Sequence, residues 1–262
     1  MNNIKPVLES IYSDKELRRS IVPLFISNPG IGKSNIIEDF MREKGVWIPP
    51  FVLSQRLPYE LSGMAMVDVE KDIMKYYDFD FLNDLKDGSI LFIDEVTSAN
   101  PMTLNAFLTF LESRVTVSGK KLPDIMIVAA GNPQGMTPLT PQIKERFVWY
   151  QTLFNQPLWI DYMMNKHSIT KSIGIKLSRL IEKEDFTGNN FSTPRSIDKA
   201  IDMIIKNVHT PYISSLLPIL QEPIENILDD IIIGEETIAK GEIKTWLELI
   251  QLKKKYSTVH CK

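Results

Sequence analysis

Apolar residues up to about Phe154 fall into short continuous runs that alternate with segments of helical spacing. This alternation is typical of a largely parallel sheet whose strands are joined by helices. The runs predict strands over residues 21–27, 46–53, 89–94, 124–131 and 147–154. The clearest helix follows Asn100 and Pro101, a capping residue and a proline suited to the first helical position. Its expected buried face carries Leu104, Phe107, Leu108 and Leu111.

From about Gln156 onward the strand-like runs disappear and only helical periodicity remains, as at Ile197 and Ile201 and again over residues 243–250. The sequence therefore predicts two domains: an α/β domain over residues 1–155 and a smaller all-α domain over residues 156–262. The final helical segment ends in Lys253-Lys254-Lys255. We interpret these lysines as a solvated last turn rather than as a nucleic-acid-binding tail, because the run is short.

Composition excludes several classes of protein. Hydrophobic residues make up 44% and charged residues 24% of the chain, close to the averages for folded globular proteins. A net charge of −3 gives no overall basic field to attract nucleic acid or a membrane surface. No apolar run approaches the roughly 18 residues of a membrane-spanning helix. Because Cys261 is the only cysteine, neither an internal disulfide nor a cysteine-rich metal site is expected.

The strongest motif follows the first predicted strand and opens a helix, which is the context of a phosphate-binding loop. It comprises Asn28, Pro29, Gly30, Ile31, Gly32, Lys33 and Ser34. The glycines let backbone N–H groups surround phosphates, Lys33 can reach the β- and γ-phosphates, and Ser34 can bind Mg²⁺. The first position of the usual pattern is Ser27 rather than glycine, which would cost backbone freedom if that position needs a positive φ.

Two adjacent carboxylates, Asp94 and Glu95, follow the apolar run over residues 90–93. Alone, this pattern also fits a buried strand that ends in two solvated acids. Downstream of a phosphate loop the pair makes chemical sense, because Asp94 can hold the Mg²⁺ shell and Glu95 can polarise an attacking water.

These motifs resemble those of AAA+ ATPases, and residues 95–119 are similar to the Walker B, helix and "r-v-t-v-x-G" turn of the MoxR-like, dynein-related group. The resemblance covers about residues 20–210. It implies a three-layer αβα P-loop NTPase core with a helical C-terminal lid. It also implies ATP and Mg²⁺ as cofactors.

Three further segments extend the resemblance: residues 127–133 look like sensor 1, residues 139–147 like an "L-x-x-A-x-x-D-R-F" segment, and residues 192–196 like sensor 2. The resemblance implies that Asn132 holds the lytic water or the γ-phosphate, that Arg146 is an arginine finger for a neighbouring subunit, and that Arg195 reaches the γ-phosphate from the lid. The alternatives are a plain Asn-Pro turn, a surface arginine beside Glu145, and an arginine that points to water. Gln142 and Glu145 depart from the family pattern.

The interval between Lys33 and Asp94 is longer than one strand-helix-strand unit requires, so an insertion is expected. Within it, residues 55–64 resemble the "p-x-D-L-x-G" loop that faces the ring channel in MoxR-like proteins, with Glu60 in place of aspartate. The aromatic stretch over residues 76–81 is expected to pack in the core rather than to grip substrate.

The resemblance implies a ring, expected to be a hexamer of this chain, that remodels a protein client. Because the sequence shows no effector fused to the motor, the client is expected to act in trans. The Ile-, Lys- and Asn-rich composition is compatible with a protein of the cytoplasm of a bacterium or of a bacteriophage host. One alternative is an ATPase that acts on nucleic acid. Another is a nucleotide-bound scaffold without turnover, in which Ser27 marks a drifted loop. No membrane partner is expected.

Overall fold

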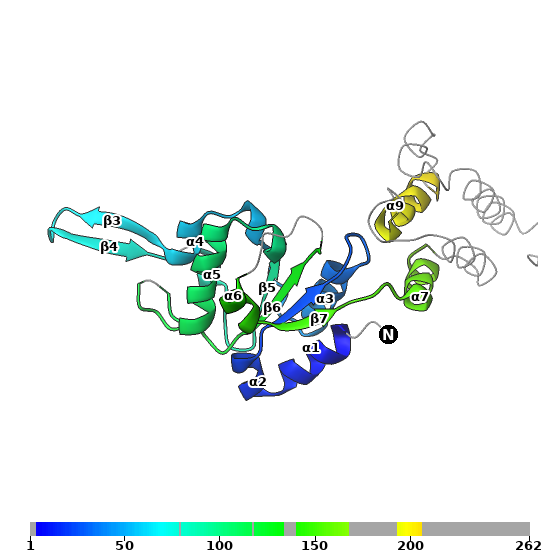
Figure 1. Ribbon diagram of the computed structural model, residues 1–262, viewed down its shortest axis with the longest axis horizontal. Helices are drawn as coiled ribbons and strands as arrows, with labels where there is room; N and C mark the ends of the chain where they lie inside the picture. The colour runs from blue at the N-terminus through cyan, green and yellow to red at the C-terminus, as the bar shows by residue number, and fades with distance from the viewer. Residues whose placement is uncertain (1–3, 79, 117, 134–139, 168–192, 206–262) are drawn as a thin grey trace, which may run out of the picture. The chain divides into compact units, whose positions relative to one another are not determined.

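A computed structural model describes residues 4–78, 80–116, 118–133, 140–167 and 193–205 (Figure 1). The chain divides into two compact units, Met1–Phe154 and Asn155–Lys262. The assignment of these units as a nucleotide-binding domain and a lid stays a prediction. The helical segment expected over residues 243–250 and the lysine run that follows it lie outside the described residues.

A five-stranded parallel sheet forms the centre of the first unit. Its strands are, in spatial order, β2 (Phe51–Val52), β5 (Ile90–Asp94), β6 (Met126–Gly131), β1 (Pro23–Ile26) and β7 (Val148–Gln151). Every pair of neighbours is parallel, so crossover connections join them. The carboxyl ends of all five strands therefore meet at one edge, where ligands bind in open α/β sheets.

Helices cover both faces of this sheet, which confirms the three-layer αβα fold class. The helices of the first unit are α1 (Ile4–Ser13), α2 (Lys15–Ser20), α3 (Lys33–Glu43), α4 (Pro58–Ser62), α5 (Pro101–Ser113) and α6 (Pro141–Glu145). Alternate strand residues belong to different cores: Ile90 and Phe92 pack with α1 and α3, whereas Leu91 and Ile93 pack with α5. Strands buried on both faces read as continuous apolar runs, which is why the sequence revealed them.

All five predicted strands are present, but β2 is much shorter than expected. The prediction covered residues 46–53, and only Phe51 and Val52 pair with β5. Pro49 and Pro50 precede them and have no N–H group to donate to a ladder. The pairing therefore begins only after the prolines.

The expected insertion is an antiparallel hairpin of β3 (Met64–Asp68) and β4 (Ile73–Tyr77) that projects from the sheet domain (Figure 1). The expectation that the aromatic stretch packs in the core was wrong for Tyr76 and Tyr77, which are 50% and 52% exposed. Both lie on a two-stranded hairpin, and no other strand in the described part of the chain pairs with it. Phe81 follows the hairpin and does pack against the core, where its ring lies 4.7 Å from that of Phe51.

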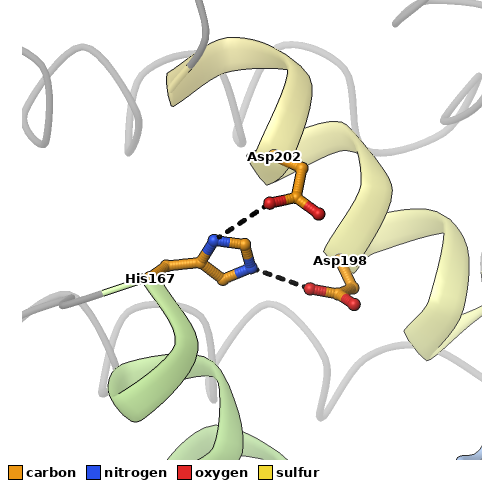
Figure 2. Close-up of side chains that lie close together, drawn as sticks. All are labelled: His167, Asp198 and Asp202. Atoms are coloured by element: carbon orange, nitrogen blue, oxygen red, sulfur yellow. Dashed lines mark hydrogen bonds and ion pairs between the residues drawn. The ribbon is translucent and has the colours of Figure 1, made fainter.

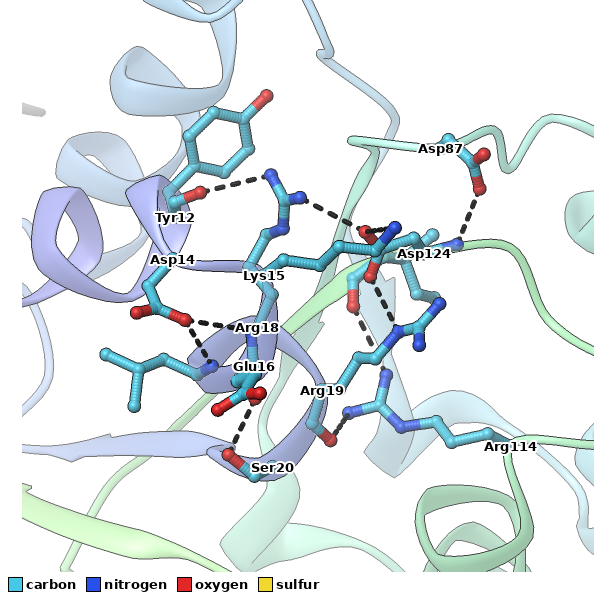
Figure 3. Close-up of polar contacts among 12 residues, drawn as sticks. Tyr12, Asp14, Lys15, Glu16, Arg18, Arg19, Ser20, Asp87, Arg114 and Asp124 are labelled. Atoms are coloured by element: carbon cyan, nitrogen blue, oxygen red, sulfur yellow. Dashed lines mark hydrogen bonds and ion pairs between the residues drawn. The ribbon is translucent and has the colours of Figure 1, made fainter.

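A charge cluster anchors α2 to the amino end of β6 (Figure 3). The buried carboxylate of Asp124 accepts hydrogen bonds from Arg18 and Arg19 at 3.1 and 3.0 Å, and Lys15 lies 3.8 Å away. Desolvation raises the pKa of Asp124, but the hydrogen bond from Arg19 and the nearby cations outweigh it and hold the pKa below its usual value. Arg114 extends the cluster by donating to the backbone carbonyls of Arg19 and Ile125.

The second unit contains two described helices, α7 (Gln156–His167) and α9 (Pro194–Ile205), which contact each other. The helical periodicity that predicted α9 is confirmed, because Ile197 and Ile201 are fully buried. None of the described helices in either unit has the length and apolar character needed to cross a membrane.

Candidate nucleotide site

The predicted phosphate loop connects the carboxyl end of β1 to the amino end of α3. Gly30 and Gly32 have φ values of 82° and 97°, a region that side chains rarely adopt. Gly32 is the N-cap of α3 and offers no side-chain hydrogen bond to the first turn. The N–H groups of a first helical turn point toward the place where an anion would bind, and the helix dipole favours negative charge there.

Ser27 does not strain this loop. The described non-glycine residues with positive φ are Asp72, Glu95 and Arg114, and Ser27 is not among them. Its side chain is buried, and its hydroxyl donates to the carbonyl of Asn28 at 3.2 Å. Serine at the first position of the motif is therefore compatible with the loop conformation.

The Lys33 ammonium joins the loop to the end of β6. The side chain is 7% exposed, and Nζ donates to the Ser27 carbonyl at 3.0 Å and to Asn132 Oδ1 at 2.9 Å. Lys33 and Asn132 are 99 positions apart in the sequence. The structure thus brings together the two residues that the sequence placed at the phosphates.

Ser34 and Asp94 lie side by side at the start of α3 and the end of β5. Ser34 Oγ donates to Asp94 Oδ2 at 2.8 Å, and Asp94 Oδ1 accepts from the backbone N–H of Glu95 at 2.8 Å. A hydroxyl and a carboxylate are hard oxygen ligands of the kind that Mg²⁺ prefers. The chemistry of these donors fits the predicted metal next to a phosphate-binding loop.

Glu95 occupies a left-handed backbone conformation, with φ 56° and ψ 34°, as the N-cap of the 3-10 turn η3 (Val96–Ser98). This conformation costs a non-glycine residue about 1–2 kcal/mol. The Ser54 hydroxyl donates to Glu95 Oε2 from the 3-10 turn η1 (Leu53–Gln55). Ser54 was not predicted, because no pattern in the sequence links residues 41 positions apart.

Arg146 follows α6 and is half exposed. Its guanidinium forms an ion pair with Glu112 on α5, and both side chains remain close to 50% exposed. The structure therefore pairs Arg146 with Glu112, not with the phosphate loop or with neighbouring Glu145. Leu139, which begins the family segment that contains Arg146, lies outside the described residues.

Arg195 is an exposed residue in the first turn of α9 in the second unit. Thr193 caps this helix: its hydroxyl accepts from Ser196 N at 3.2 Å, and the Ser196 hydroxyl accepts from Thr193 N at 2.7 Å. The helix begins at Pro194, directly after this cap. Ser192 lies outside the described residues, and the role of Arg195 stays a prediction.

A second cluster of polar side chains joins α7 to α9 (Figure 2). His167 Nε2 lies 2.7 Å from Asp198, and Nδ1 lies 3.5 Å from Asp202. Lys166 Nζ contacts the same two carboxylates at 2.8 and 3.0 Å. Burial lowers the pKa of Lys166, but the hydrogen bonds to Asp198 and Asp202 outweigh it and raise the pKa above its usual value.

One histidine and two carboxylates at this spacing could hold a metal ion. However, the two ring nitrogens of His167 face different carboxylates (Figure 2), and the Lys166 ammonium already forms ion pairs with both. The arrangement suits an ion-pair network that fixes α7 against α9. Sequence analysis did not find this network, because the partners are 31 to 36 positions apart.

Comparison with known proteins identifies the first unit. Residues 24–147 match the AAA domain family, dynein-related subfamily. This segment is an AAA domain of the dynein-related subfamily. It contains the phosphate loop, Asp94, Glu95 and Asn132 and ends just after Arg146. The expected kinship with dynein-related AAA proteins is therefore confirmed.

Solved structures with a similar fold include RuvB from Thermotoga maritima. A point variant of that protein is 15% identical, with a TM-score of 0.55 over 84% of this chain and 70% of RuvB. The structure described as the RuvB Holliday junction branch migration motor is 14% identical, with a TM-score of 0.52 over 83% of this chain and 68% of RuvB. At this identity the likeness shows the fold alone. A comparison with curated proteins found no match.

Proposed function

We propose that this AAA domain hydrolyses ATP with Mg²⁺ in a ring of identical subunits and uses the energy to remodel a protein partner. The observation that carries the proposal is the convergence of Lys33, Ser34, Asp94, Glu95 and Asn132 at the carboxyl edge of one sheet. These residues come from three separate segments of the chain. They supply the groups that phosphoryl transfer needs: a cation, metal ligands, a base and an amide.

Each residue has a distinct role in the proposed reaction. Lys33 binds the β- and γ-phosphates, and the loop N–H groups orient them. Ser34 and Asp94 hold Mg²⁺, which neutralises charge on the phosphate oxygens when bound. Glu95 accepts a proton from the attacking water, and the Asn132 amide orients that water or the γ-phosphate. Release of Glu95 from Ser54 would free its carboxylate for this task.

The ring is part of the proposal because the described site has no arginine of its own beside Lys33. Arg146 is exposed and pairs with Glu112 on the surface, where a neighbouring subunit could draw it to its own nucleotide. Arg195 of the second unit would reach the γ-phosphate within the same chain. We propose a hexamer, in keeping with the family resemblance.

The β3–β4 hairpin supports a protein client over nucleic acid. Cross-strand neighbours share a face, and one face consists of Ala65 opposite Tyr76 and Val67 opposite Met74. Val67, Met74 and Tyr76 are 65%, 62% and 50% exposed. Such a patch of apolar side chains, including a flexible methionine, is typical of surfaces that bind apolar polypeptide.

The charges of the hairpin also favour a protein client over nucleic acid. Over residues 64–77 the only cations are Lys71 and Lys75, against Asp68, Glu70 and Asp72. Lys75 is already paired with Asp68. A surface on which three carboxylates outnumber two lysines gains little from counterion release at a phosphate backbone. DNA, on which the RuvB motor acts, is the second candidate because of the shared fold.

We expect the double variant Val67→Ser/Met74→Ser to bind a labelled, permanently unfolded polypeptide about tenfold or more weakly than the parent, since removal of two apolar contacts costs at least about 1.4 kcal/mol. Binding is measured by fluorescence anisotropy in the Glu95→Gln background with Mg²⁺ and ATP. Leu153→Ser, which changes a residue 69% exposed outside the hairpin, is the matched control and should bind normally.

The same titration with a labelled single- or double-stranded oligonucleotide at moderate salt tests the second candidate. The proposal predicts no saturable binding of DNA and no stimulation of ATP hydrolysis by it. Tight DNA binding that survives the hairpin substitutions would contradict a protein client and favour a nucleic-acid motor.

A further inference from the structure

Thr97 lies in η3, two positions after Glu95, and its side chain is completely buried. Its hydroxyl donates to the backbone carbonyl of Asn132 at 2.8 Å and accepts from the backbone N–H of Asn132 at 2.9 Å. One hydroxyl thus satisfies both backbone polar groups of a single residue. The two residues are 35 positions apart, one after β5 and the other after β6.

The residue before Asn132 makes this contact possible. A Cβ atom on Gly131 would lie 2.7 Å from Thr97 Cγ2 and 2.8 Å from Thr97 Oγ1, and 3.2 Å from Ile26 Cδ1. Gly131 is not among the glycines of positive φ, so space rather than backbone conformation requires glycine there. Thr97 therefore packs directly on the backbone of β6. A larger residue in place of Gly131 would push Thr97, and with it the turn that follows β5, away from the end of β6.

This contact ties together the two residues assigned to the attacking water. Glu95 begins the turn that contains Thr97, and Ser98 N closes that turn with a 3.0 Å hydrogen bond to the Glu95 carbonyl. Asn132 presents its Oδ1 to Lys33. With the peptide groups on both sides of Asn132 held by Thr97, the Asn132 side chain keeps a fixed direction relative to the turn that carries Glu95.

We propose that Thr97 is a positioning residue that sets the placement of Asn132 relative to Glu95. This inference rests on the proposed ATP hydrolysis and adds a residue that no motif in the sequence identifies. Thr97 has no part in holding nucleotide, since its hydroxyl is occupied by the Asn132 backbone. Its loss should therefore slow the chemical step and leave binding intact, because reacting groups displaced by about 1 Å can lose about 10²-fold in rate.

The test compares Thr97→Val, which has a similar shape but no hydroxyl, with Thr97→Ser, which keeps the hydroxyl. Thr103→Val is the matched control, because Thr103 is equally buried and its hydroxyl donates to the Arg56 carbonyl at 3.0 Å. Steady-state hydrolysis gives kcat and KM, and a fluorescent ATP analogue gives Kd. We expect Thr97→Val to lower kcat about 10–100-fold with Kd within about threefold of wild type, and Thr97→Ser and Thr103→Val to stay within about threefold in both.

An unchanged kcat in Thr97→Val would overturn the inference, as would a parallel loss of nucleotide binding or a Thr97→Ser variant as slow as Thr97→Val. If the wild type itself fails to hydrolyse ATP, the proposed function fails instead. In that case, the side-chain amide resonance of Asn132, in protein labelled with ¹⁵N-asparagine, tests whether Thr97 positions Asn132. It should shift in Thr97→Val but not in Thr97→Ser, and an unshifted resonance in both overturns the inference.

Discussion

Replacement of Glu95 by glutamine is expected to lower the rate of ATP hydrolysis by about 10²–10⁴-fold, the usual contribution of a general base. The amide has the shape of the carboxylate and can still accept a hydrogen bond from Ser54, but it cannot take a proton from water. Because Glu95 is assigned to the attacking water and not to the phosphates, ATP affinity should stay within about threefold of wild type. Phosphate release and equilibrium binding of a fluorescent ATP analogue measure the two quantities.

Glu43→Gln provides the control for this substitution. Glu43 is an exposed residue at the end of α3 that pairs with Lys5, and its loss should change neither quantity. Hydrolysis by Glu95→Gln at the wild-type rate would show that another group activates the water. The assignment of Glu95 would then be wrong even if the protein is an ATPase.

The second large effect is expected for Arg146→Ala, which should reduce kcat by about 10³-fold or more if Arg146 acts as an arginine finger. A guanidinium that stabilises charge in the transition state contributes little to ground-state affinity, so nucleotide binding should persist. Arg146→Lys should remain strongly impaired, because an ammonium lacks the planar fork of donors. Glu112→Gln, which removes the ion-pair partner but keeps the arginine, should retain turnover.

A mixing experiment tests whether Arg146 acts on a neighbouring subunit. Arg146→Ala has an intact phosphate loop, and Lys33→Ala has an intact finger, so mixed rings contain some complete sites. The mixture should hydrolyse ATP although each variant alone is nearly inactive. A mixture no more active than its components would exclude action in trans.

The sequence predicted the sheet well because parallel strands buried on both faces require unbroken apolar runs. Residues 90–93 and 126–130 satisfy that requirement, and their side chains alternate between two cores. The prediction for β2 was too long because the apolar residues before Pro49 and Pro50 cannot contribute to a ladder. Apolar character alone did not distinguish a paired residue from an unpaired one.

The hairpin was missed for a related physical reason. Strand prediction relies on one buried and one solvated face, but β3 and β4 expose apolar residues on both faces. Tyr76 and Tyr77 were expected in the core because aromatic rings usually contribute to core packing. Large exposed apolar residues that break the usual pattern are the feature that now suggests a partner.

The phosphate-loop motif and the acidic pair brought Lys33, Ser34 and Asp94 into the predicted site, and the family resemblance added Asn132. The structure places these residues together. Motifs identify the residues that act on the ligand, but they do not identify the residues that hold these side chains in position. Ser54, Thr97 and the His167 network each act through partners more than 30 positions away. Only the folded arrangement shows those contacts.

The central claim, ATP hydrolysis at sites completed by neighbouring subunits, is tested most directly by the hydrolysis rate per subunit as a function of protein concentration, with Lys33→Ala as the baseline. The account predicts that the rate per subunit equals the Lys33→Ala baseline in dilute protein. The rate should then rise with protein concentration and reach a plateau as rings form. A rate that stays at the Lys33→Ala baseline at every concentration, or one that is above it but independent of concentration down to the monomer, would contradict the account.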